Sequence, residues 1–80
     1  MMERKDILEQ VQTVFREELE DETIVLTENS TAKDIEDWDS LSHIQLVSAI
    51  EKHFGIRFLS REILSWQNVG EMVDSIAAKI

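Results

Sequence analysis

The sequence has 80 residues and is 42% hydrophobic and 31% charged, a balance typical of a small globular domain rather than a disordered chain. We therefore interpret residues 1–80 as one domain. A domain of this size buries only roughly 60–65% of its unfolded surface, which leaves little room for a deep catalytic pocket. The chain has no cysteine, so disulfides, thiolate metal sites and cysteine nucleophiles are excluded.

The net charge is −9, which disfavours binding to nucleic acid or to anionic membranes and predicts basic surfaces on protein partners. The acids are concentrated between Glu17 and Asp39, where ten acidic residues accompany one base, Lys33. No apolar run approaches the ~18 residues of a membrane span, and the first residues lack the apolar stretch of a signal peptide. We expect a cytoplasmic monomer.

Apolar residues recur at helical spacing from about residue 3 to residue 19, at Ile7, Leu8, Val11, Val14, Phe15 and Leu19. No period persists from residue 20 to residue 37. This stretch therefore predicts a long loop, pinned by three consecutive apolar residues that we expect to be buried, Ile24, Val25 and Leu26. Loops of this length in small domains are usually functional or needed by the topology.

The second helix begins at Asp39-Ser40 and runs to His53 or Phe54, with Gly55 where a left-handed cap belongs. Ser60 to Leu64 reads as a short capped helix, and Asn68 to Glu71 has the spacing of a capping box that opens a last helix. That helix is expected to bury Val69, Met72, Val73, Ile76, Ala77 and Ile80. The sequence thus predicts an all-α fold, a small antiparallel four-helix bundle with three main helices and one short one.

The second helix is apolar on more than one side. Taking 100° per residue, a core stripe contains Leu46, Val47, Ile50 and Phe54. Leu41 and Ile44 lie outside this stripe, on the side that also carries Gln45, Ser48 and Lys52. An exposed apolar pair there indicates a docking surface. The alternative is that the short helix or the long loop covers the pair.

Asp39-Ser40-Leu41 is weak evidence by itself, because Asp and Ser start many helices for stability alone. Its context from Ile35 to Phe58, IEDWDSLSHIQLVSAIEKHFGIRF, resembles the acyl carrier proteins of fatty-acid, polyketide and related biosynthesis. The resemblance implies that Ser40, flanked by Asp39 and Leu41, receives a 4′-phosphopantetheine arm from coenzyme A under a phosphopantetheinyl transferase. The arm would supply the thiol that the sequence lacks and would carry acyl groups as thioesters, without catalysis by the chain.

The resemblance also implies a set of partner enzymes that activate, transfer or condense acyl groups. It places the contacts with them on the second helix, at Leu41, Ile44 and Ser48, and we extend this face to Gln45 and Glu51. Family members that serve fatty-acid synthesis commonly have a strongly acidic second helix, whereas residues 41–54 here carry only Glu51 against Lys52. This difference favours a specialised pathway.

Two other functions remain open. An aminoacyl or peptidyl carrier would use the same arm for a different cargo, and a helical adaptor would bind partners through Leu41 and Ile44 without any modification. His43 follows Ser40 by three residues, but a hydrolase also needs an orienting third group and an oxyanion hole, so we expect no catalysis. Asp34, Glu36, Asp37 and Asp39 resemble a calcium loop only loosely, and we expect no metal site.

Trp38 has two interpretations. It packs along the arm or its cargo, or it is a hydrophobic staple that fixes the entry of the second helix, which is the interpretation we favour. Trp66, beside the short helix, is interpreted as a core residue.

Overall fold

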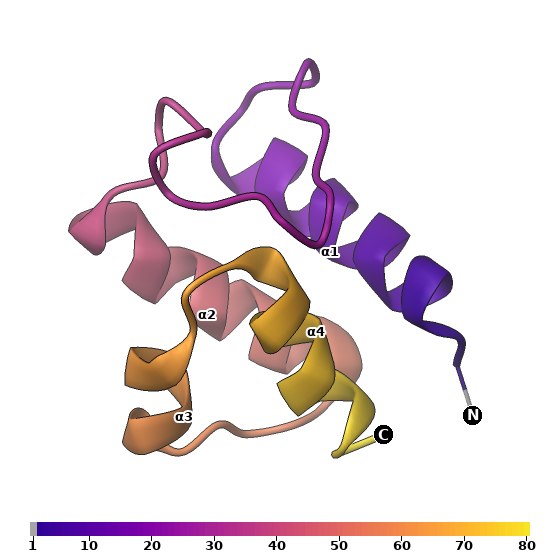
Figure 1. The fold of residues 1–80 in the computed structure, drawn as a ribbon. Helices are drawn as coiled ribbons and strands as arrows, with labels where there is room; N and C mark the ends of the chain where they lie inside the picture. The colour runs from indigo at the N-terminus through magenta and orange to yellow at the C-terminus, as the bar shows by residue number, and fades with distance from the viewer. Residues whose placement is uncertain (1) are drawn as a thin grey trace.

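The computed structural model describes residues 2–80 and contains four helices, α1 (Arg4–Glu18), α2 (Ser40–Phe54), α3 (Ser60–Ser65) and α4 (Val69–Ala77) (Figure 1). α1 runs from the N-terminus toward the long loop, and α2 returns in the opposite direction (Figure 1). α1 packs against both α2 and α4. The predicted all-α bundle of three main helices and one short helix is confirmed, and no strand occurs within residues 2–80.

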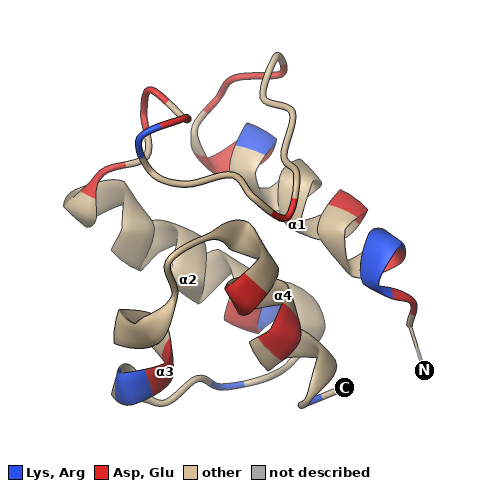
Figure 2. Cartoon of the chain, in the orientation of Figure 1, with Lys and Arg blue, Asp and Glu red and all other residues tan. Residues whose placement is uncertain are grey.

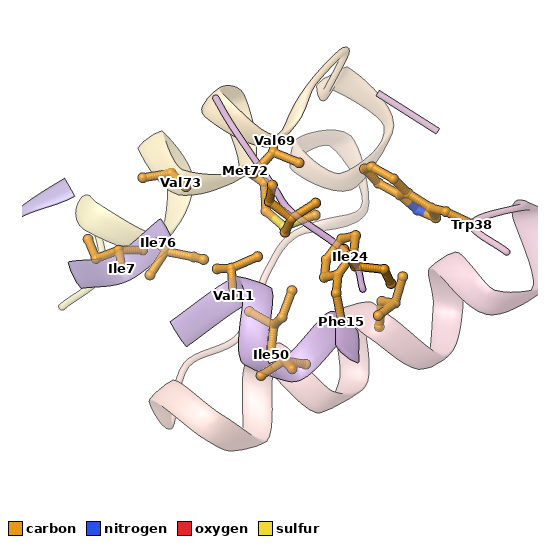
Figure 3. Packing of buried hydrophobic residues seen from close by; sticks show 13 residues of the cluster. Ile7, Val11, Phe15, Ile24, Trp38, Ile50, Val69, Met72, Val73 and Ile76 are labelled. Atoms are coloured by element: carbon orange, nitrogen blue, oxygen red, sulfur yellow. The ribbon is translucent and has the colours of Figure 1, made fainter. Parts of the chain in front are cut away.

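The core lies where these three longer helices meet (Figure 3). Each fully buried Ile, Leu, Val, Phe or Met contributes about 1.5–3 kcal/mol relative to exposure, so these side chains supply most of the stability. Ile80 is an exception to the predicted core, because α4 ends at Ala77 and leaves Ile80 exposed; Ala77 is only partly buried. The core contains Ile7, Val11, Val14, Phe15, Ile24, Leu26, Trp38, Leu46, Ile50, Val69, Met72, Val73 and Ile76.

The first part of the long loop is held against α1 by polar bonds. Arg16 Nε donates to the carbonyl oxygen of Ile24 over 2.8 Å, and the amide of Leu26 donates to Gln12 Oε1 over 2.9 Å. Ile24 and Leu26 are buried as predicted, but the prediction for Val25 is wrong, since this side chain is 69% exposed. Ile24 and Leu26 are the residues bonded to α1 and buried against it, and Val25 between them faces solvent.

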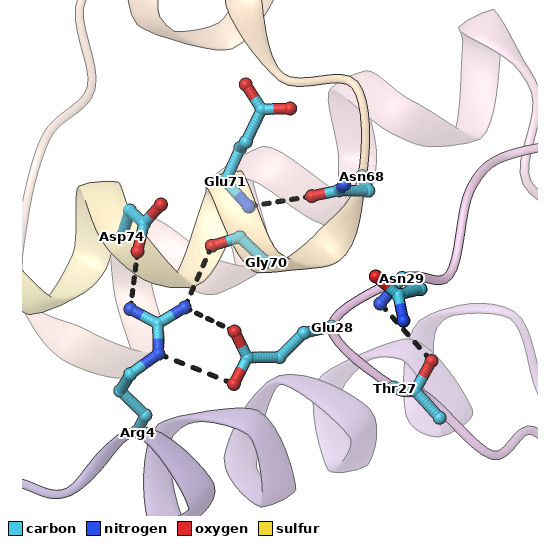
Figure 4. Close-up of polar contacts among 8 residues, drawn as sticks. All are labelled: Arg4, Thr27, Glu28, Asn29, Asn68, Gly70, Glu71 and Asp74. Atoms are coloured by element: carbon cyan, nitrogen blue, oxygen red, sulfur yellow. Dashed lines mark hydrogen bonds and ion pairs between the residues drawn. The ribbon is translucent and has the colours of Figure 1, made fainter.

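The second part of the loop lies on the start of α4. The amides of Val69 and Gly70 donate to the carbonyl oxygens of Ser30 and Glu28 over 2.9 and 2.8 Å. Arg4 connects the same region to α1, because its guanidinium pairs with the carboxylates of Glu28 and Asp74 (Figure 4). These pairs are exposed and screened by water, so they fix the position of the loop more than they stabilise the fold. Figure 2 shows that acidic residues lie along this loop, whereas α2 is largely uncharged.

The helix ends follow the sequence closely. Gly55 has the left-handed φ of +67° that the cap of α2 requires, and the amide of Ile56 donates to the carbonyl of Glu51. Asn68 caps α4 by accepting from the amide of Glu71 over 2.9 Å. The return bond of the predicted capping box is shifted by one residue, since Glu71 accepts from the amide of Gln67.

The cap of α3 also differs from the prediction. The helix begins at Ser60, but no side-chain oxygen of Ser60 forms a capping bond within residues 2–80. Instead, Glu62 reaches back and accepts from the amide of Leu59 over 2.9 Å. Lys79 Nζ lies 3.0 Å from the same carboxylate oxygen, Glu62 Oε1.

Candidate functional site around Ser40

Ser40 is the first residue of α2 and is exposed. Its hydroxyl forms no hydrogen bond to any residue between 2 and 80. An enzyme can therefore reach this oxygen without breaking an internal contact.

The neighbouring Asp39 carries out the capping of α2. Its carboxylate accepts from the amides of Leu41 and Ser42 over 3.0 and 2.9 Å, and the amide of Asp39 donates to Ser42 Oγ over 2.9 Å. These bonds, led by the one from the Ser42 backbone, lower the pKa of Asp39. Asp39 thus occupies two of the amides at the start of α2, as a helix-capping residue does.

Trp38 precedes this cap and is buried against the core, with its ring perpendicular to Phe15 at a centroid distance of 4.9 Å. It also stacks on His43, four residues beyond the cap residue, with 6.0 Å between ring centroids and 25° between ring planes. Trp38 and His43 thus occupy the two positions of a hydrophobic staple, before and after the start of the helix, with an imidazole in place of an aliphatic side chain. Trp38 Nε1 donates to His43 Nδ1 over 3.0 Å.

The arrangement does not make His43 a base for Ser40. Its Nδ1 atom accepts from Trp38, and no carboxylate orients the ring among the described contacts of residues 2–80. Burial lowers the pKa of His43, so the ring is neutral near pH 7. The side chain is therefore built into the start of α2 rather than into a nucleophile–base pair.

A cavity of about 450 Å³ opens beside Ser40, between the first turns of α2 and the segment from α3 to the start of α4. Its volume falls in the range of small-molecule sites. The wall is mainly apolar, and Trp66 on this wall donates its Nε1–H to Ser75 Oγ over 2.9 Å. The lining residues are Ala32, Trp38, Asp39, Ser40, His43, Ile44, Ile63, Leu64, Trp66, Gln67, Asn68 and Met72.

The outer side of α2 is open. Leu41 is 73% exposed and Ile44 is 67% exposed, so neither the loop nor α3 covers them. Gln45 and Ser48 are exposed on the same helix. Glu51 has a different surrounding: it is partly buried, and its Oε2 atom accepts from the amide of Phe58 over 2.8 Å, which ties α2 to the segment before α3.

Sequence reasoning did not anticipate the contribution of α3 to this site. Leu64 is 85% exposed, and both Leu64 and Ile63 line the cavity from this helix. A helix of six residues is too short to show a reliable apolar period, so its faces could not be assigned. The one signal in the sequence was the adjacent apolar pair Ile63-Leu64 in an otherwise polar segment.

Comparison with known proteins matches residues 7–76 to the family described as "Phosphopantetheine attachment site". An acyl carrier protein of Thermosynechococcus vestitus is 31% identical over 80 residues, covering 99% of this chain and 98% of its own length. An acyl carrier protein of Saccharopolyspora erythraea is 30% identical over 73 residues, covering 91% and 77%. This chain belongs to the acyl carrier protein family. The solution structure of holo acyl carrier protein from Geobacter metallireducens superposes with a TM-score of 0.86, at 38% identity over 91% of this chain and 84% of that one.

Membership confirms the resemblance found in the sequence and makes the chain a non-catalytic carrier whose prosthetic group is 4′-phosphopantetheine. Carriers of this family interact with a phosphopantetheinyl transferase and with acyl-handling enzymes. The surroundings of Ser40 fit such a group, because an unbonded hydroxyl lies beside an apolar cavity. When bound, the group supplies a thiol to a chain without cysteine.

Within residues 2–80, no cluster of three or more His, Asp or Glu side chains is arranged to hold a metal ion. No helix in that range is long and apolar enough to cross a membrane.

Proposed function

We propose that Ser40 is the attachment residue and that the chain carries acyl groups as thioesters between biosynthetic enzymes. In the attachment step, an O–P bond forms at Ser40 Oγ. The pyrophosphate bond of coenzyme A breaks, the adenosine bisphosphate leaves, and the hydroxyl proton goes to a base of the transferase. The observation that carries the assignment is positional. Among the exposed serines of residues 2–80, Ser40 is the one that also lines the cavity.

Asp39 and Leu41 support Ser40 in different ways. Asp39 holds the first turn of α2 through its two amide bonds, which fixes the backbone that presents the Ser40 hydroxyl. Leu41 contributes exposed apolar surface next to that hydroxyl. Neither side chain takes part in chemistry in this proposal.

The partner face consists of Leu41, Ile44, Gln45 and Ser48, with Glu51 contributing to its far end. Residues 41–54 contain one acid and one lysine, so this face attracts partners through apolar contact more than through charge. Such a face suits the transferase and a narrow set of acyl-activating, acyl-transferring or condensing enzymes. We propose a specialised pathway in the cytoplasm, with the chain acting as one domain and as a monomer.

Intact mass spectrometry tests the assignment. The purified chain is incubated with coenzyme A, magnesium and a broad-specificity phosphopantetheinyl transferase, beside Ser40→Ala and the matched variant Ser60→Ala, which removes an exposed serine at the start of another helix. We expect the mass of one phosphopantetheine to be added to the wild type and to Ser60→Ala, but not to Ser40→Ala. A folded wild type that gains no mass, or a Ser40→Ala variant that does gain mass, contradicts the assignment.

An aminoacyl or peptidyl cargo is the second candidate, and the nearly uncharged α2 favours it over a fatty-acid cargo. The two are separated by identifying the thioester formed when the holo chain meets acyl-activating or amino-acid-activating enzymes. Loading by the amino-acid enzymes alone rejects the acyl assignment. An unmodified adaptor that binds through Leu41 and Ile44 is the conclusion if Ser40 is never modified.

A further inference from the structure

His43 has a defined tautomer because of its neighbour. The indole N–H of Trp38 can only donate, and it donates to His43 Nδ1 over 3.0 Å. The Nδ1 atom must therefore be an unprotonated acceptor, and the proton of the neutral ring lies on Nε2. Burial of the ring, which lowers the pKa of His43, favours the same neutral form.

The ring of His43 also forms part of the wall beside Ser40. The two residues are three positions apart on α2 and so lie on the same side of the helix, and both line the cavity. Trp66 is perpendicular to the imidazole on another side, with 6.3 Å between ring centroids. The Nε2–H group has no hydrogen-bond partner among residues 2–80, so its donor capacity is unused.

The other polar groups of the wall are arranged differently. The indole N–H of Trp66 is used by Ser75, and the Oδ1 atom of Asn68 is used by the amide of Glu71, while the Nδ2 group of Asn68 is a second, amide donor on the wall. Gln67 is exposed at the rim. The remaining wall near His43 is apolar, through Ile44, Ile63, Leu64 and Met72. The cavity thus combines an apolar surface with one partly buried ring donor held in a fixed orientation.

We propose that the Nε2–H group of His43 donates a hydrogen bond to a hydroxyl or keto oxygen on the acyl chain carried through Ser40, beyond the thioester carbonyl, so that the cavity prefers oxygen-bearing chains over a saturated alkyl chain. This inference rests on the proposed function, because it requires cargo attached at Ser40. Trp38 is the positioning residue, since its N–H group fixes the tautomer that leaves the donor on Nε2.

The preference follows from hydrogen-bond energetics. A saturated chain that enters the cavity removes water from the Nε2–H group and offers no acceptor, which costs free energy. An oxygen at the same place restores the bond. One net hydrogen bond of this kind changes an equilibrium by a factor of roughly two to ten. Sites built to bond an oxygen discriminate against analogues that lack it.

The first experiment compares matched cargoes on the full chain. The Ser40 arm is loaded with octanoyl or β-hydroxyoctanoyl groups through a stable amide in place of the thioester, and intact mass verifies each product. Nitrogen-15 NMR then follows His43 Nε2 and its proton. We expect the β-hydroxy cargo to shift this signal and to slow exchange of its proton, relative to the octanoyl cargo. A shift already present with the unloaded arm, and unchanged by either cargo, identifies an amide carbonyl of the arm as the acceptor and overturns the preference for oxygen-bearing cargo.

Identical His43 signals in the unmodified, arm-bearing, octanoyl and β-hydroxyoctanoyl forms overturn the inference while leaving the proposed function intact. If the arm cannot be attached at Ser40, intact mass spectrometry shows this separately. That result overturns the proposed function together with this inference. A free chain whose His43 carries its proton on Nδ1 also overturns the inference, without reference to any cargo.

Variants test the role of the donor in a second way. With thioester cargo, the rate of release by hydroxylamine measures how well the cavity protects each group. In the wild type we expect the β-hydroxy cargo to be protected roughly two- to tenfold better than the octanoyl cargo. His43→Phe should abolish this ratio. His43→Gln should retain part of the ratio, because its side-chain amide can accept from Trp38 and still donate to the cargo. Since it keeps the bond to Trp38, this variant should also fold more like the wild type than His43→Phe does. An unchanged ratio in both variants contradicts the inference.

Discussion

The amide of Gly70 donates a hydrogen bond to the carbonyl oxygen of Glu28 over 2.8 Å. This bond joins the long acidic loop to the first turn of α4, and α4 in turn packs on α1 (Figure 1). The contact is close enough that residue 70 has no space for a side chain: a Cβ atom there would lie 2.9 Å from the same carbonyl oxygen. The position of the loop therefore depends on glycine at this residue.

We predict that Gly70→Ala destabilises the fold by about 1–3 kcal/mol, because the backbone of the loop must move to admit the methyl group. The sign is informative, since glycine to alanine inside a helix normally stabilises by about 1 kcal/mol. Urea unfolding followed by circular dichroism measures the change. Gly55→Ala is the matched control. A Cβ atom at residue 55 would meet no neighbour, so the loss of stability comes from the φ of +67° alone. Gly55→Asn should destabilise the fold less than Gly55→Ala, because Asn adopts this conformation more readily. An unchanged midpoint for Gly70→Ala contradicts this prediction.

Substitution of Asp39 and Ser40 should separate capping from attachment. Asp39→Ala removes the acceptor of two amides and should destabilise the fold by about 0.5–2 kcal/mol, whereas Asp39→Asn should cost less because Asn is also a good cap. Ser40→Ala should change the free energy of unfolding by less than about 0.5 kcal/mol, since its hydroxyl has no internal bond. Thermal melting of the unmodified proteins provides the comparison. A large loss from Ser40→Ala would show that the serine also has a structural role.

The sequence predicted most of the fold because its helices carry local signals. The ends of α2 are an example: Asp39 and Gly55 are residues whose side chain or φ determines where a helix begins and ends, and both predictions hold. Exposure of Leu41 and Ile44 was predictable as well, because a helical wheel of 15 residues separates two faces clearly.

The features that sequence reasoning missed depend on contacts between distant residues. Val25 looked buried because its two neighbours are apolar, but which of the three side chains face the core is set by the bonds of Ile24 and Leu26 to Arg16 and Gln12 in α1. The cavity beside Ser40 was not predicted, since it requires α3 to lie against the start of α2. The bond from Trp38 to His43 was missed because an imidazole is not expected in a hydrophobic staple.

Glu20 offers a stabilising substitution. It follows α1 with a φ of +52°, the left-handed conformation that costs a residue with a side chain roughly 1–2 kcal/mol. Glycine avoids this strain, but it loses more conformational entropy on folding, which destabilises the fold by roughly 0.5–1 kcal/mol. We expect Glu20→Gly to stabilise the fold by about 0.5–1 kcal/mol in urea unfolding. Glu22→Gly, in the same acidic segment, removes the same charge without relieving a positive φ and should not stabilise. Equal gains from both variants would attribute the effect to charge.

The stability should decrease in two stages as the pH falls. Burial lowers the pKa of His43 in the folded state, so below the unfolded value of about 6.5 the unfolded chain binds more protons. Stability is therefore complete above about pH 6.5 and declines as the pH falls from there toward the folded pKa. His43→Gln should lack this first stage. We propose urea unfolding by circular dichroism across this range, since the signal does not depend on quenching of Trp38 by the neighbouring imidazole.

The second stage belongs to carboxylates. Backbone donation from Ser42 lowers the pKa of Asp39, and the bond from Arg4 lowers the pKa of Glu28. Groups of this kind contribute stability above their unfolded pKa, about 4, and lose it as the pH falls through their lower folded pKa. Asp39→Asn should therefore reduce the slope below about pH 4 while leaving the first stage unchanged. A variant that alters the first stage instead would show that Asp39 and His43 titrate together.

The partner face can be tested against an equally exposed residue elsewhere. Ile44 on α2 is 67% exposed and Val25 on the loop is 69% exposed, so Ile44→Glu and Val25→Glu add the same charge at the same degree of exposure. Both should alter the free energy of unfolding by less than about 0.5 kcal/mol. If α2 is the face that the transferase contacts, Ile44→Glu should reduce kcat/KM for modification of Ser40 by roughly tenfold or more, as loss of a central apolar contact does. Val25→Glu should leave kcat/KM near the wild-type value. Equal losses in the two variants would mean that added charge, rather than the apolar contact at Ile44, controls recognition.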